Sequence, residues 1–214
     1  MQSRAPLILA LCLSLAPAGA AAGAWLRAEG TGFASWTVKV QDDESATAYS
    51  TLFAEYGLNP DLTVGLDLGS DEEGEHKALA FVRVPLSREG LHVAFELGAG
   101  ALDEGAALRP GISVGKGLDL AGLGGWWNLD TRAELTQGGT ELAIDATLGV
   151  APWEGTKLIT QLQQGGPLAD PDFIRLEGAA VWQVAPGRLL EVGLTTALKD
   201  SEDFGVKFGI WHEF

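Results

Sequence analysis

The chain has 214 residues and a formal net charge of −15, from 14 Lys and Arg against 29 Asp and Glu. This balance excludes a nucleic-acid-binding surface, which needs clustered basic residues to contact phosphates. Beyond the first two dozen residues no stretch holds 18 consecutive apolar residues, which excludes a helical membrane protein.

The first 24 residues have the order of a secretory signal. Arg4 is the only charged residue among them, an apolar core at 7–15 follows it, and small residues fill 16–24. This succession of a charged start, a short apolar stretch and small residues is typical of export signals. The apolar core is too short to cross a bilayer as a helix, which takes about 20 apolar residues.

Three cleavage positions fit the small-x-small rule for signal processing: after Ala20, after Ala22 and after Ala24. The single cysteine, Cys12, lies in the same segment, and Leu11 before it is too large for lipoprotein processing. The mature chain therefore has no thiol chemistry. We expect residues 1–24 to be a cleaved signal peptide and residues 25–214 to form one domain.

The remaining chain alternates between apolar and polar residues in stretches as long as tilted membrane strands require, about 9–11 residues. The pattern predicts twelve strands, at 31–40, 46–57, 62–69, 77–86, 91–101, 107–115, 126–136, 140–151, 156–164, 173–184, 188–199 and 203–214. Ten or fourteen strands are alternatives, because the connection at 116–125 is long and apolar for a turn. The predicted fold is all-β, an antiparallel up-and-down transmembrane β-barrel.

One face of these strands is apolar and the other carries charge. Leu62, Val64, Leu66 and Leu68 illustrate the apolar face, with Asp67 on the opposite one. In a membrane barrel the charged face lines the lumen. The predicted lumen-lining residues are Lys39, Glu55, Asp67, Arg83, Glu96, Arg109, Asp130, Arg132, Glu134, Asp145, Lys157, Arg175, Glu177, Glu191 and Lys207. Acids and bases are nearly balanced in this set, which predicts internal ion pairs and weak charge selectivity.

Periodicity alone also fits a soluble sandwich or barrel, whose apolar faces would meet each other. The connections favour the membrane. Every second one is short, such as 59–61 and 186–187, as periplasmic turns of outer-membrane barrels are. The other set is acidic, without Lys or Arg under these strand boundaries: Asp42, Asp43, Glu44, Asp71, Glu72, Glu73, Glu75, Asp103, Glu104, Asp170, Asp172, Asp200, Glu202 and Asp203.

Tryptophan is concentrated at the level of the short turns. Trp25, Trp126, Trp127, Trp153, Trp182 and Trp211 all fall there, together with Tyr56 and Phe214. Aromatic side chains gather at membrane–water interfaces, so this distribution predicts an interfacial girdle. The apolar face would contact outer-membrane lipid, and the acidic loops would lie beside lipopolysaccharide.

The C-terminal stretch 204–214 alternates over its whole length and stops on Phe214. It resembles the terminal strand of bacterial outer-membrane barrels, whose last aromatic residue is read by the barrel-assembly machinery. On this resemblance Phe214 is the assembly signal, and the chain resides in the outer membrane.

Two further segments resemble a group of bacterial outer-membrane barrel proteins described as transporter-like. One is 23–33, with Gly23-Ala24-Trp25 and Gly30-Thr31-Gly32-Phe33; the other is 52–67, which includes AEYGLNPDLTVGLD. They cover under a fifth of the chain. The resemblance implies the barrel and its location, and it transfers no catalytic or ligand residue.

No constellation of residues points to catalysis. An outer-membrane hydrolase needs a base beside a nucleophile or water. The three histidines, His76, His92 and His212, are spread over an acidic loop, a lumen position and an outward position. The acidic run at 71–75 lacks the spacing of a dedicated calcium loop. We expect no catalytic, cofactor or metal site and no enzyme activity.

Three functions remain open at this point. The first is a narrow, weakly selective channel or transporter for small solutes. The second is a structural or surface-interaction barrel with a plugged lumen and no transport. The third is a soluble periplasmic β-barrel. If the first is correct, the acidic loops bias the external mouth towards cations through their field.

Overall fold

The computed structural model describes residues 23–42, 48–71, 74, 76–103, 105–167, 170–199 and 203–214. Of the expectations above, the bulk of the signal peptide at 1–22 and the loop acids Asp43, Glu44, Glu72, Glu73, Glu75, Glu104, Asp200 and Glu202 lie outside the described residues. Among the described residues no helix is long and apolar enough to cross a membrane.

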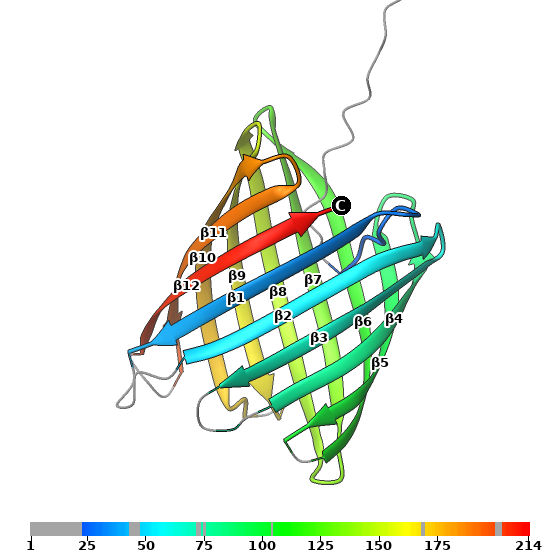
Figure 1. Ribbon diagram of the computed structural model, residues 1–214, viewed down its shortest axis with the longest axis vertical. Coiled ribbons are helices and arrows are strands. Elements are labelled where there is room, and N and C mark those ends of the chain that lie inside the picture. Colours follow the sequence, from blue (N-terminus) through cyan, green and yellow to red (C-terminus); the bar gives the residue numbers. More distant parts are fainter. Residues whose placement is uncertain are drawn as a thin grey trace, which may run out of the picture.

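The described residues form twelve strands (Figure 1). Their bounds are β1 Gly32–Gln41, β2 Ala48–Asn59, β3 Leu62–Asp71, β4 His76–Ser87, β5 His92–Leu102, β6 Gly105–Leu120, β7 Leu123–Leu135, β8 Thr140–Trp153, β9 Thr156–Gly166, β10 Phe173–Ala185, β11 Arg188–Ala197 and β12 Phe204–Glu213. Each strand pairs antiparallel with the next, and β12 pairs antiparallel with β1. The sheet is thus a closed up-and-down barrel without a free edge, as the sequence predicts.

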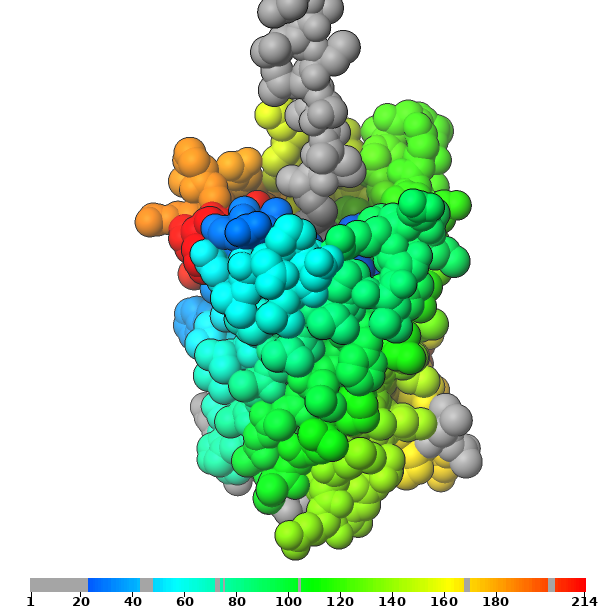
Figure 2. Space-filling view, turned by 90° about the vertical axis from the view of Figure 1, so that its right-hand side faces the viewer, coloured from blue at the N-terminus to red at the C-terminus, as the bar shows by residue number. Residues whose placement is uncertain are grey.

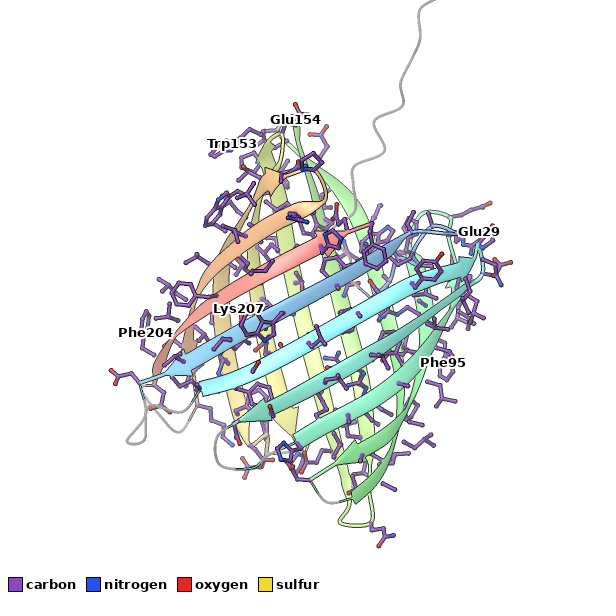
Figure 3. All side chains as sticks on the ribbon, in the orientation of Figure 1. Glu29, Phe95, Trp153, Glu154, Phe204 and Lys207 are labelled. Carbon is purple, nitrogen blue, oxygen red and sulfur yellow. The ribbon has the colours of Figure 1, made fainter. Side chains whose placement is uncertain are left out.

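The outer face of the barrel is apolar and exposed. Trp36, Leu66, Leu162 and Phe208 are among the many large apolar side chains left uncovered there. Figure 3 shows Phe95 and Phe204 projecting from the outside of the wall, and Figure 2 shows a continuous wall over β2–β6. The charged positions face inward and many are buried. This distribution is the reverse of a soluble barrel, so the third functional alternative is wrong: the chain is a transmembrane barrel of the outer-membrane type.

The connections at the two ends of the barrel differ. At the end that holds the start of β1 and the C-terminus, uppermost in Figure 1, four of the five turns have two residues, including 154–155 and 186–187. We call this the turn end. The opposite loop end has connections of up to six residues, such as 167–172 and 198–203. Short turns face the periplasm in this class of barrel.

The expectation of a long apolar turn at 116–125 is wrong. β6 continues to Leu120 and β7 starts at Leu123, so the turn is only Ala121 and Gly122. These residues have φ values of 57° and 88°, the left-handed conformation that tight hairpins of two residues require. The apolar residues of this region are therefore strand residues of a hairpin that extends the wall.

The acidic connections also hold a base. The sequence boundary at 188–199 put Lys199 in a strand, whereas β11 ends at Ala197. Lys199 therefore lies in the connection to β12, with its Nζ atom 2.6 Å from Asp170 Oδ1. Loops β9–β10 and β11–β12 are joined by this ion pair, and the claim that these connections lack Lys and Arg is corrected.

The C-terminal residue closes the seam between β1 and β12. The Phe214 backbone N–H donates to the Gly32 carbonyl at 3.0 Å, and the Gly32 N–H donates to the Phe214 carbonyl at 2.6 Å. The Phe214 ring lies where a side chain at position 32 would be, and it stacks on His212 with ring centroids 5.3 Å apart. The last residue thus contributes to barrel closure.

Candidate functional site

The first group of inward charges lies on β2–β6. Arg83 donates from Nη1 to Glu55 Oε2 at 2.8 Å and from Nη2 to Glu96 Oε2 at 2.7 Å. Arg109 donates from Nη1 to Asp67 Oδ2 at 2.6 Å and from Nη2 to Glu96 Oε1 at 3.3 Å. We call these five residues the arginine cluster. All five are buried, and the two guanidinium groups each bridge two carboxylates.

Two further bases extend the arginine cluster. Lys77 on β4 approaches Asp67 Oδ1 at 2.8 Å, and the Arg27 Nε atom donates to Glu55 Oε1 at 2.7 Å. Glu134 on β7 lies 3.9 Å from the Arg109 guanidinium. Neither Lys77 nor Arg27 is in the predicted set. Lys77 has the same parity along its strand as Arg83, so the alternation carried a signal for it.

The second group lies on the opposite wall, on β1 and β10–β12. Glu177 Oε1 is 2.7 Å from Lys207 Nζ, and Glu177 Oε2 is 2.8 Å from Lys39 Nζ. Lys207 also approaches Glu191 Oε1 at 2.9 Å. We call these four residues the lysine cluster; Figure 3 labels Lys207 within it. Its two ammonium groups are more exposed than the guanidinium groups, at 18% and 13% against 6% and 2% of the side-chain surface.

The other predicted lumen residues lie on β7–β9, between the two clusters, except for Arg175, which is on β10 beside Glu177. Arg132 donates to Asp145 across β7 and β8. The Lys157 Nζ atom is 3.6 Å from Glu213 Oε1, and the Arg175 guanidinium lies 5.3 Å from the ring centroid of Phe173. Asp130 accepts hydrogen bonds from Ser113 and Asn128. The sequence thus placed all these residues by alternation, but it did not show which of them meet.

Residues 23–31, here called the N-terminal segment, enter the turn end of the lumen: residues 23–27 lie inside it, and residues 28–31 are exposed at the rim, where Figure 3 labels Glu29. The Ala24 N–H donates to Asn128 Oδ1 on β7 at 3.2 Å. The Trp25 ring lies 5.1 Å from the His92 ring on β5, and the Arg27 N–H donates to Thr63 Oγ1 on β3 at 3.0 Å. At its far end the segment pairs with Gly57 on β2 before entering β1.

The N-terminal segment spans the lumen from one side to the other. It begins against β7 and ends at β1, and in a ring of twelve strands these two are opposite each other. Its contacts with the barrel fall on β1, β2, β3, β5, β6 and β7, mainly over the arginine cluster. The strand pattern did not predict that the N-terminal segment lies in the lumen, because residues ahead of the first strand show no alternation.

The predicted tryptophan girdle is partly wrong. Trp25, Trp126 and Trp211 lie inside the barrel, although they are at the expected level. Trp126 occupies the space beside Gly149, and the Trp211 Nε1 atom donates to Glu191 Oε2 at 2.9 Å. Trp153 is outside at the turn end, as Figure 3 shows, and Trp182 lines a groove on the outer face. The aromatic side chains inside the barrel therefore narrow the lumen at the turn end. The sequence predicted only an outer ring of aromatic residues at this level.

Phenylalanine side chains fill the lumen at the arginine cluster. Phe33, Phe53 and Phe81 form a row across β1, β2 and β4, with the Phe53 and Phe81 rings stacked at 5.5 Å. The Arg27 guanidinium lies 4.5 Å from the Phe33 ring centroid. These phenylalanines share the inward parity of the charged residues, so alternation could have revealed them. This side of the lumen is packed like a protein core.

The histidines do not assemble into a reactive group. His92 contacts Trp25 in the lumen, His212 stacks on Phe214 outside, and the His76 N–H donates to Asp103 at the loop end. Among the described residues no group of three or more His, Cys, Asp or Glu is placed to hold a metal ion.

Comparison with known proteins is informative for structure only. No protein-family model matches the sequence, and no curated protein does. The fold is similar to the KdgM porin, with 7% identity, a TM-score of 0.68 and coverage of 85% of this chain and 99% of that one. That porin is also known in complex with disordered oligogalacturonate.

Two other solved structures share the fold. For the NanC porin the identity is 7% and the TM-score 0.65, with 84% of this chain and 98% of that chain covered. For an outer membrane channel from Pseudomonas putida the identity is 9% and the TM-score 0.56, with 89% and 97% covered. The chain therefore has the twelve-stranded barrel fold that outer-membrane porins and channels also have.

Proposed function

We propose that this chain is a narrow outer-membrane channel that passes small solutes slowly and with little charge selectivity. The observation that carries the proposal is the one-sided position of the N-terminal segment. Apart from the contact of Arg27 with Phe33 on β1, its contacts lie on β2, β3 and β5–β7, whereas the lysine cluster and the polar side chains of β8–β12 face the other part of the lumen. The proposed solute path runs along β8–β12 and β1, past Lys39 and Lys207, whose side chains are 18% and 13% exposed.

The charge arrangement supports small uncharged or zwitterionic solutes. Arg83, Arg109, Lys39 and Lys207 each hold at least one carboxylate. The KdgM porin has been solved with oligogalacturonate, an acidic oligosaccharide. A polyanion of that kind would have to displace the carboxylates of this lumen from their bases. The ion pairs of the lumen have little net charge but strong local dipoles. They can therefore interact with solutes that carry no net charge.

The experiment is conductance and reversal potential in planar bilayers at 0.1 M and 1 M salt. We expect small currents, with a cation bias at low salt that fades at high salt, because the screening length drops from about 10 Å to about 3 Å. Neutralising Asp71, Glu72 and Glu73 to Asn, Gln and Gln reduces the bias. The control neutralises Asp61, Glu89 and Glu154 at the turn end, and it leaves the external bias in place. Strong anion selectivity at low salt would contradict the proposal.

A closed structural barrel is the second candidate, favoured by one observation. Thr63, Arg109, Asn128 and Val181 point inward from different walls and are at most 2% exposed, so part of the lumen is filled. The same conductance experiment separates the two candidates. No current from protein whose folding is verified by resistance to detergent denaturation would replace the channel with the closed barrel.

We further propose that Phe214 is recognised by the barrel-assembly machinery. Its carboxyl-terminal position on the closing strand and its exposed ring support this role. Deleting Phe214 should reduce the amount of folded protein in the outer membrane severalfold, whereas Phe204→Ala at the other end of β12 should reduce it little. Normal levels of the deletion variant would contradict the role.

A further inference from the structure

The inner end of the N-terminal segment lies against a recess formed by β6 and β7, which holds the half-buried carboxylate of Asp130. The Asp130 carboxylate accepts hydrogen bonds from the Ser113 hydroxyl and from the Asn128 side-chain amide. The Asn128 carbonyl oxygen accepts the Ala24 backbone N–H. Ala24 and Asn128 are 2% and 1% exposed. These hydrogen bonds fix the beginning of the segment beside the carboxylate.

Gly23 enters this recess because it has no side chain. A Cβ atom at position 23 would overlap both the Asp130 carboxylate and the Ser113 hydroxyl. The backbone nitrogen of Gly23 is bonded to the same Cα, so it lies within a few ångströms of the carboxylate. In the uncleaved chain this nitrogen is a neutral amide.

Asp130 forms no ion pair with a base of the described barrel wall, although the charges of Arg132 and Arg83 act on it from a longer distance. A buried carboxylate is costly unless a cation pairs with it. Arg132, two residues along β7, is hydrogen-bonded to Asp145, and Arg83 is hydrogen-bonded to Glu55 and Glu96. Within the described part of the chain no Lys or Arg forms an ion pair with Asp130.

We propose that signal processing cuts between Ala22 and Gly23, and that the new α-ammonium group of Gly23 pairs with Asp130 inside the lumen. Water adds across the Ala22–Gly23 amide bond. The Ala22 carbonyl carbon takes the hydroxyl and leaves with the signal peptide as a carboxylate, and the Gly23 nitrogen becomes an amine that takes up a proton. Ala20 and Ala22 supply the small residues that the processing peptidase requires.

The two other cleavage positions fit the recess less well. Cleavage after Ala24 would remove both Gly23 and the Ala24 N–H that bonds to Asn128. Cleavage after Ala20 would leave two residues ahead of Gly23 and move the ammonium group up to about 7 Å away. Only a chain that starts at Gly23 brings the charge to Asp130. The ion pair would anchor the N-terminal segment across the lumen, whether or not the barrel conducts.

The test is mass spectrometry of the mature protein purified from outer membranes, followed by amine labelling. The N-terminal peptide should begin at Gly23; a start at Ala21 or Trp25 would overturn the inference. A water-soluble acylating reagent at neutral pH should label the α-amine of the folded protein at least about tenfold more slowly than that of the denatured protein.

Two variants locate the protection. Asp130→Asn should release the α-amine and raise its labelling rate to near the denatured value. Glu134→Gln, on the same face of β7 but directed at Arg109, should leave the protection intact. Equal labelling of folded and denatured wild-type protein would overturn the ion pair, and this comparison holds even if a variant does not assemble.

Discussion

The two clusters in the lumen have similar composition and different surroundings. In the arginine cluster, planar guanidinium groups bridge pairs of carboxylates, phenylalanines pack beside them, and the N-terminal segment covers them. In the lysine cluster, point charges share Glu177 and remain partly exposed. Arginine presents a rigid fork suited to fixed networks, whereas lysine is a hydrated charge on a flexible stem. On the proposed function, the wall of the arginine cluster holds the structure together and the wall of the lysine cluster lines the solute path.

The largest effect should come from removing one base from each cluster. Arg109→Ala leaves Asp67 with Lys77 and Glu96 with Arg83, but it removes from both carboxylates a guanidinium that is only 2% exposed, so the free energy of unfolding should fall by about 3–5 kcal/mol. Lys207→Ala should cost about 1–3 kcal/mol, because Glu177 keeps Lys39, Glu191 keeps the hydrogen bond from Trp211, and the lysine side chains are more exposed than Arg109. Urea unfolding in phospholipid vesicles measures both. An equal or larger loss for Lys207→Ala would remove the distinction between the walls.

The next effect tests whether the clusters face the lumen at all. Leu162 on β9 is 44% exposed on the outer face, and its neighbour Gln163 points inward, opposite Asp145. Leu162→Arg should lower the free energy of unfolding by about 2–4 kcal/mol if it meets the bilayer midplane. Gln163→Arg should change it by less than about 1 kcal/mol, since the new cation can pair with Asp145. The reverse order would mean that the register is shifted by one residue.

The smallest effect on stability should come from the ion pair of Lys199 and Asp170. It lies in the loops outside the barrel wall and serves as a reference for the buried ion pairs. The hydrogen bond from Lys199, together with its charge, lowers the pKa of Asp170 below its ordinary value. The associated stabilisation is complete above the ordinary pKa of about 3.9 and is lost as the pH falls through the lower folded value. Carboxyl NMR titration should show a lower midpoint for Asp170 in wild-type protein than in Lys199→Met, with no resolvable change in thermal midpoint at neutral pH. Identical titration midpoints would show that the pair does not form.

Alternation predicted the fold because a strand repeats every two residues and the barrel wall has only two faces. In this way the sequence assigned Asp67 to the lumen-facing side of its strand and Leu66 to the outer face. The partners of the charges were not predictable: Lys39 meets Glu177 from a strand that is not its neighbour, and only the tilt and stagger of the closed barrel decide this.

Two other features lay beyond the pattern. Trp25 was assigned to the interface because it sits at the correct level, but the segment that carries it folds inward through contacts with Asn128 and Thr63. The hairpin of β6 and β7 was read as a long turn because apolar residues, Leu120 on β6 and Leu123 on β7, lie on both sides of a short left-handed turn. Both errors concern segments where the chain leaves a simple alternation.

The central claim is that solutes pass along β8–β12 and β1 and not along the wall under the N-terminal segment. Two serines offer a matched test in a mature chain without other cysteines. Ser35 on β1 is half-buried, whereas Ser113 on β6 is 6% exposed beneath the segment. Each is replaced by cysteine, and the current in planar bilayers is recorded before and after a charged, water-soluble thiol reagent is added. The account predicts that Ser35→Cys channels are blocked and that Ser113→Cys channels are not. Block at Ser113→Cys alone, or to the same extent at both positions, would contradict it.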